Sequence, residues 1–76
     1  MDAKIYTTPS CVYCRMAKEY FKKNNIAYEE KDVQSDLAAR EEMVAKSHQM
    51  GVPVIDIGGR IIVGFNRPEI DQSLGL

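Results

Sequence analysis

Apolar and polar positions along the chain divide its first third into a strand and a helix. Residues 3–7 are rich in β-forming side chains and predict a strand, which the Thr8-Pro9-Ser10 segment interrupts. Apolar residues at helical spacing then predict a helix over about 12–23, with Ser10 as a candidate N-terminal cap. Asn24 and Asn25 mark the end of this helix.

The remaining residues predict five more elements. Residues 26–33 indicate a second strand with weak alternation, and Ser35 or Asp36 can cap a helix that runs to about Ser47, in a region that Gly51 ends. The apolar stripe of that helix is thin and consists of Leu37, Ala38 and Val44. Two β-branched runs, 52–57 and 60–63, flank Gly58-Gly59 and predict a hairpin, and Pro68 opens a short last helix that includes Leu74.

The predicted order is β-α-β-α-β-β-α, which defines an α/β fold. Strands joined by a crossover helix should be parallel, and the hairpin should add two antiparallel strands. We therefore expect a four-stranded mixed sheet flanked by three helices. At 76 residues the chain has room for a single domain, residues 1–76, and its 45% hydrophobic content is typical of a globular protein.

Charge and hydropathy narrow the possible partners. The net charge is −1 and no basic block occurs, which argues against nucleic acid as a partner. No apolar run approaches the ~20 residues of a membrane span. The N-terminus leads straight into the first predicted strand without the long apolar stretch of a secretory signal, so we expect a cytoplasmic protein.

The two cysteines, Cys11 and Cys14, lie where the first strand passes into the first helix. A helix N-terminus presents unpaired N–H groups and a partial positive charge, and both favour a thiolate over a thiol. Cys11 is nearest to that field and on the exposed loop side, whereas Cys14 is about one turn further in and should be more buried. We therefore expect Cys11 to attack a disulfide and Cys14 to resolve the mixed disulfide.

Metal binding is the alternative use of the pair. A zinc site needs four ligands, and one chain offers only the two cysteines and a distant histidine, His48. Two chains together would supply four thiolates, so a metal or iron–sulfur cluster shared by a dimer stays open as an alternative.

Three spaced motifs resemble the glutaredoxin family: Tyr6 to Cys14, Gly51-Val52-Pro53 and Gly64-Phe65-Asn66. The resemblance covers essentially the whole chain and is closest to short prokaryotic glutaredoxin-like proteins. It implies a thioredoxin fold, glutathione as co-substrate with no tightly bound cofactor, and protein disulfides as clients. We expect the protein to act as a monomer.

The same resemblance implies a set of site residues. Pro53 would follow a cis peptide bond, and Val52 would pair its backbone with glutathione or with a client peptide. Tyr13 would line the site beside Cys11. The remaining contacts to glutathione would come from Phe65 and Asn66 at the γ-glutamyl end and from Gln49 near the glycine carboxylate.

Departures from the family pattern weaken the assignment of glutathione and leave a second reductant open. Val12 replaces a common proline, Thr8 a common basic residue and Gly51 the usual threonine, and Asn66-Arg67 stands where the family has two acidic residues. The stretch from Gly64 to Pro68 is also similar to redoxins that donate electrons to ribonucleotide reductase. Such redoxins take their electrons from thioredoxin reductase, which is therefore a possible partner.

Overall fold

The computed structural model describes residues 2–76, and Met1 lies outside the described residues. The strands are β1 (Ala3–Thr7), β2 (Glu29–Asp32), β3 (Val54–Ile57) and β4 (Arg60–Val63), and the helices are α1 (Val12–Lys23), α2 (Leu37–Ser47) and α3 (Arg67–Leu74). Their order is β-α-β-α-β-β-α, as predicted. β1, α1 and β4 have the predicted bounds.

The strands form one mixed sheet in the order β2-β1-β3-β4. β1 runs parallel to β2, with Ile5 opposite Glu30, and antiparallel to β3, with Ile5 opposite Ile55. β3 and β4 form the antiparallel hairpin around Gly58-Gly59. The predicted minimal thioredoxin fold is confirmed, and its central strand β1 leads directly to the cysteines.

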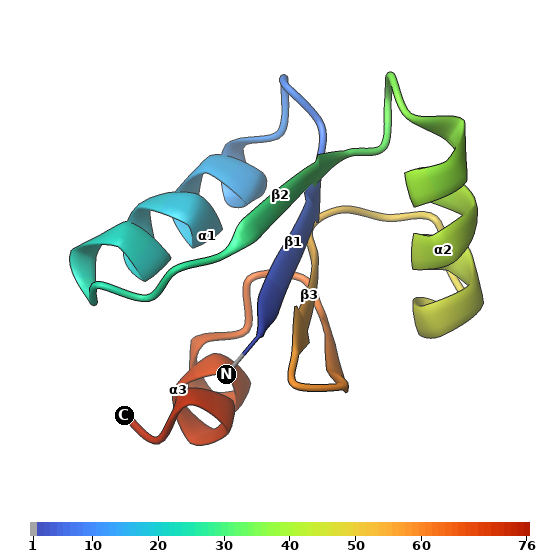
Figure 1. Ribbon diagram of the computed structural model, residues 1–76. Helices are drawn as coiled ribbons and strands as arrows, with labels where there is room; N and C mark the ends of the chain where they lie inside the picture. Colours follow the sequence, from blue (N-terminus) through green and yellow to red (C-terminus); the bar gives the residue numbers. More distant parts are fainter. Residues whose placement is uncertain (1) are drawn as a thin grey trace.

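The helices cover both faces of this sheet (Figure 1). α1 and α3 pack on one face, where Ala17, Phe21 and Ile70 contact a cluster that includes Ile5 and Ile55. α2 packs on the other face through Ala39 and Met43, which join Tyr6, Val33 and Val54. The side chains of β1 alternate between the two clusters, as the period of a strand requires.

Two predicted strands are shorter than expected. Residues 26–28 do not belong to β2, because the Ile26 N–H donates to the Phe21 carbonyl at 2.9 Å and Asn25 adopts a left-handed φ of 58°. These residues complete the end of α1 as a helix-terminating turn. Val52 and Pro53 precede β3, because proline has no N–H to donate to a sheet ladder.

α2 begins and ends as predicted but buries a different face. Asp36, one of the two predicted caps, accepts from the Ala39 N–H at 3.1 Å, and the helix ends at Ser47, followed by His48 in a left-handed conformation with φ 61°. The buried residues are Ala39 and Met43, whereas Leu37 is 66% exposed. The helix is therefore rotated relative to the predicted stripe. No helix among residues 2–76 is both long enough and apolar enough to cross a membrane.

Candidate functional site

Cys11 occupies the N-cap position of α1. Its sulfur accepts the Cys14 N–H at 3.2 Å, and its backbone is extended, with φ −88° and ψ 118°. The expectation that Ser10 caps the helix was therefore wrong, because the residue whose side chain accepts a first-turn N–H is the cysteine itself. A free, half-buried sulfur at this position receives both a hydrogen bond and the partial positive charge of the helix end.

Cys14 lies behind Cys11 with none of its surface exposed. Burial raises the pKa of the Cys14 thiol to about 12, and its hydrogen bond with Cys11 acts in the same direction. A backbone hydrogen bond from Thr8 and the charge of Lys18 act against these effects and lower that pKa. The two thiols therefore differ in access: only Cys11 can meet a substrate in solution.

The loop that carries Pro53 lies beside Cys11. The Val52–Pro53 peptide bond is cis, which confirms the expectation. The Cys11 thiol points to the Val52 carbonyl at 3.9 Å, and the Gly64 N–H donates to the Pro53 carbonyl at 2.8 Å. The start of α1 thus meets the residues before β3 at the Cys11 sulfur, and the residues after β4 bond to that same loop through Pro53.

Gln49 uses its side chain within this loop. Its Oε1 accepts the Gly51 N–H at 2.5 Å, and its Nε2 donates to the Gly51 carbonyl at 3.1 Å and to Ser47 Oγ at 3.2 Å. The two bonds between the Gln49 side chain and the Gly51 backbone are here called the Gln49 clamp. A Cβ on residue 51 would lie 2.7 Å from that Oε1, so the clamp requires a glycine at this position. The side chain is engaged in the loop and not turned to the surface beside Cys11.

The other predicted site residues are Tyr13, in the first turn of α1, and Phe65 and Asn66, just before α3. Tyr13 is 62% exposed next to Cys11. Phe65 is half-buried and packs edge-on against Tyr20, with ring centroids 5.8 Å apart. Asn66 is exposed, and its side chain caps α3 by accepting the Glu69 N–H at 3.3 Å.

One hollow adjoins the cysteine loop, and a second lies further along α1. The first, here called the Arg40 hollow, has a volume of about 210 Å³, and its lining includes Thr8, Gln34, Arg40, Met50 and Val52. It adjoins Cys11, because the Cys11 N–H donates to the Thr8 carbonyl and the Cys11 thiol faces Val52. Arg40 thus lines a hollow that Thr8 and Val52 share, a position that the sequence analysis missed because it depends on the packing of α2 on the sheet.

The second, here called the Phe65 hollow, has a volume of about 230 Å³ and its lining includes Met16, Glu19, Tyr20, Phe65 and Arg67. The Arg67 guanidinium lies 4.6 Å from the centroid of the Tyr20 ring. Met16 is 42% exposed at this edge. Two cations, Lys23 and Arg67, thus line a hollow between α1 and the start of α3, together with the partly exposed Met16.

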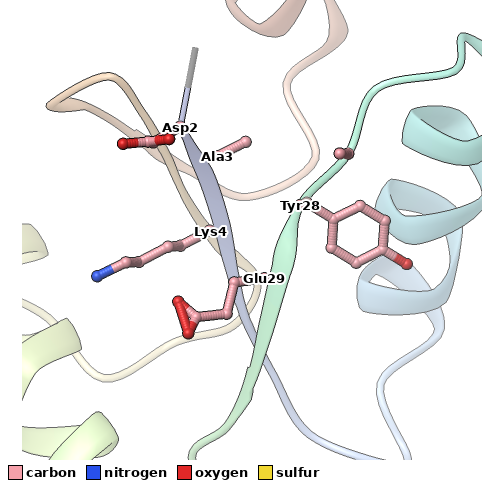
Figure 2. A pocket seen from close by; sticks show the side chains of 6 residues that line it. Asp2, Ala3, Lys4, Tyr28 and Glu29 are labelled. Atoms are coloured by element: carbon pink, nitrogen blue, oxygen red, sulfur yellow. The ribbon is translucent and has the colours of Figure 1, made fainter.

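A hollow of about 390 Å³ lies at the far end of the sheet. Asp2, Lys4, Tyr28 and Glu29 line it, at the start of β1 and β2 (Figure 2). The cysteines follow the opposite end of β1, so this hollow is separate from the thiol chemistry. Among residues 2–76, no three histidine, cysteine or acidic side chains gather as a metal ion would require.

The fold and the unequal thiol pair define the chain as a small thiol oxidoreductase of the thioredoxin-fold class. The glutaredoxin family model matches residues 3–62, and the chain belongs to the glutaredoxin family.

Two curated relatives agree with this assignment. An uncharacterized glutaredoxin-like 8.6 kDa protein in the rubredoxin operon of Clostridium pasteurianum is 54% identical over 93% of this chain and 95% of its own length. Glutaredoxin 3 of Escherichia coli K12 is 33% identical over 83% of this chain and 76% of its own length.

Solved structures show the same fold. The T8A mutant of the thioredoxin-like protein BC3987 superposes with a TM-score of 0.91 at 36% identity, covering 96% of this chain and 94% of the other. The glutaredoxin-like NrdH-redoxin of Escherichia coli, described as having a thioredoxin-like activity profile, gives a TM-score of 0.85 at 26% identity, with 95% and 93% covered.

Proposed function

We propose that this protein is a cytoplasmic, monomeric, glutathione-dependent oxidoreductase that reduces protein disulfides and glutathione mixed disulfides. The observation that carries the proposal is the asymmetry of the pair: Cys11 is accessible and caps a helix, whereas Cys14 is fully buried one turn behind it. This arrangement suits a nucleophile and a resolving thiol. Membership of the glutaredoxin family supports glutathione as the co-substrate.

With a client disulfide the reaction proceeds by four thiol–disulfide exchanges, two with the client and two with glutathione. The Cys11 thiolate attacks a client disulfide, a Cys11–client bond forms, and the other client sulfur leaves and takes up a proton. Cys14 then loses its proton and attacks the Cys11 sulfur, which releases the second client thiol and leaves a Cys11–Cys14 disulfide. Two molecules of glutathione reduce this disulfide and become glutathione disulfide. With a glutathione mixed disulfide, Cys11 alone suffices.

The surroundings of Cys11 supply contacts for the tripeptide. Val52 lies just outside the β3 ladder, where an extended peptide can pair with its backbone as an added strand. The Arg40 hollow begins beside Val52 and offers a guanidinium for the glycine carboxylate. We assign that contact to Arg40 because Gln49 is engaged with Gly51. Phe65 and Asn66 lie on the other side, for the γ-glutamyl end.

One observation favours a second candidate, reduction by thioredoxin reductase. Asn66 and Arg67 replace acidic residues that would hold the α-ammonium of glutathione, and Arg67 covers Tyr20 as a cation. The similarity to the NrdH-redoxin of Escherichia coli supports the same alternative.

Coupled NADPH oxidation with a small glutathione mixed disulfide distinguishes the two reductants. One reaction contains glutathione and glutathione reductase, and the other contains thioredoxin reductase. We expect turnover in the first, lost in Cys11→Ser and retained in Cys14→Ser. Turnover only in the second reaction would show that thioredoxin reductase is the reductant. No turnover in either reaction would refute the oxidoreductase proposal.

The same assay tests the role of Arg40 by comparison with a matched control substitution. Arg40→Met should raise the KM for glutathione about fivefold, the effect of about 1 kcal/mol from one exposed charged contact, with little change in kcat. Arg60→Met removes an equivalent charge from the start of β4, which is remote from the cysteines, and should leave both constants unchanged. Equal effects of the two substitutions would refute the assignment to Arg40.

A further inference from the structure

A small polar cluster joins three elements behind the thiol pair. The Lys18 Nζ on α1 donates to Glu30 Oε2 on β2 at 2.8 Å. The Thr7 hydroxyl on β1 donates to the same oxygen at 3.1 Å, although Thr7 is only 1% exposed. The two hydrogen bonds converge on one carboxylate oxygen and hold the otherwise flexible lysine side chain in place.

Lys18 follows Cys14 by four residues on α1, so the two side chains share a face of the helix. The lysine charge acts on the thiol and lowers the pKa of Cys14, against the burial that raises it. Glu30 carries the opposing charge, but 44% of its side chain is exposed against 24% for Lys18. Water therefore screens the carboxylate more than the ammonium.

Resolution of a mixed disulfide places charge at the less accessible sulfur. Cys14 must give its proton to solvent, attack Cys11 and form the Cys11–Cys14 bond, while the client sulfur leaves as a thiolate and takes up a proton. The attacking sulfur has no exposed surface, so water does little to stabilise its negative charge. A fixed cation nearby would favour that charge without touching the first step at Cys11.

Resting on the proposed role of Cys14 as the resolving thiol, we propose that Lys18, held by Glu30 and Thr7, is a positioning residue that favours the Cys14 thiolate during resolution. The lysine acts through the thiol and does not contact the substrate. Its effect is confined to the second exchange, because the first uses Cys11 alone.

Stopped-flow reaction of the reduced protein with 5,5′-dithiobis(2-nitrobenzoate) separates the two steps. The first thionitrobenzoate is released when Cys11 attacks, at a rate that depends on reagent concentration. The second is released when Cys14 attacks the mixed disulfide, at a rate that does not. Cys14→Ser should release only the first. If the wild type gave no second phase, the dithiol mechanism would itself fail, and this outcome is independent of which reductant the protein uses.

We expect Lys18→Met to slow the second phase about threefold to tenfold, as one partly screened charge predicts, and to leave the first phase within about twofold. Lys18→Gln keeps a hydrogen-bond donor without the charge and should slow the second phase equally, whereas Lys18→Arg should restore it. Lys22→Met removes an exposed charge one turn further along α1 and serves as the matched control.

Three results would overturn the proposal. An unchanged second phase in Lys18→Met and Lys18→Gln would show that the charge has no part in resolution. Equal slowing of both phases, or equal slowing by Lys22→Met, would show a general effect on the helix. Failure of Lys18→Arg to restore the rate would also contradict a role for charge.

Discussion

Because the Gln49 side chain bonds to the Gly51 backbone, we expect Gly51→Ala to have a different effect on stability with and without that side chain. Gly51→Ala would place a Cβ 2.7 Å from Gln49 Oε1. That atom ends a flexible side chain, so we expect the amide to move away and the backbone to stay. The substitution then breaks two hydrogen bonds between the Gln49 side chain and the Gly51 backbone.

The magnitude follows from two opposing contributions. The two bonds lie at a largely exposed position and together contribute about 1 kcal/mol, the low end of the range for such bonds. Gly51 does not have a positive φ, so alanine fits the backbone at this position. Alanine also reduces the conformational entropy of the unfolded chain, which stabilises the fold by about 0.4–1 kcal/mol. Gly51→Ala should therefore be nearly neutral in the wild type and stabilising in the Gln49→Ala background.

Urea unfolding of the wild type, both single variants and the double variant measures this coupling. We expect a coupling free energy of about 1 kcal/mol. A coupling below about 0.3 kcal/mol, the level of additive substitutions, would show that the clamp does not hold in solution.

Three further predictions concern the thiols, the core and the half-buried ion pair of Lys46 and Asp56. Iodoacetamide at pH 8 should add a single label, at Cys11, because Cys14 is buried and its pKa is raised to about 12. Peptide mass analysis locates the label, and labelling of Cys14 at a similar rate would contradict the assignment. Phe21→Ala should cost about 3–5 kcal/mol, a large share of the total stability of a small domain, and the shift of the urea midpoint measures it. Lys46→Met should cost about 1–2 kcal/mol at pH 7, because it leaves Asp56 without the bond that Lys46 donates at 2.8 Å. Burial raises the pKa of Asp56, but bonds from Lys46 and Gly59 outweigh it and hold that pKa below its ordinary value. The stability from this pair is therefore complete above about pH 4 and lost as the pH falls through the folded-state pKa, so the difference between wild type and Lys46→Met should shrink in acid. A difference that is constant with pH would refute this account.

The elements that sequence predicts correctly are those with local causes. β1, α1 and the hairpin strand β4 have the predicted bounds, because β-branched runs, helical spacing and a Gly-Gly turn act within a few residues. The cis bond before Pro53 and the burial of Cys14 also agree, the first through family resemblance and the second through helix spacing.

The turn that shortens β2 is a local error, because the Ile26 N–H bonds to the Phe21 carbonyl five residues earlier. The other errors come from contacts between residues distant in sequence. The docking of α2 on the sheet buries Ala39 instead of Leu37. The same docking brings Arg40 to the cysteine loop, and the pairing of β1 with β2 brings Glu30 to Thr7. Because no local pattern encodes these contacts, only the folded chain reveals them.

The substitution Asn66→Asp tests whether glutathione binds at Asn66 while leaving the stability of the fold nearly unchanged. Its side chain caps α3, and aspartate caps a helix about as well as asparagine does. Asn66→Asp should therefore leave the unfolding free energy within about 0.5 kcal/mol of the wild type, with a small gain from the helix dipole. The new carboxylate would stand where glutathione presents its α-ammonium, so the KM for glutathione should fall. Urea unfolding and the glutathione-coupled assay measure the two effects. An unchanged KM together with unchanged stability would show that the γ-glutamyl end does not lie at Asn66, and would favour the reductase-driven alternative.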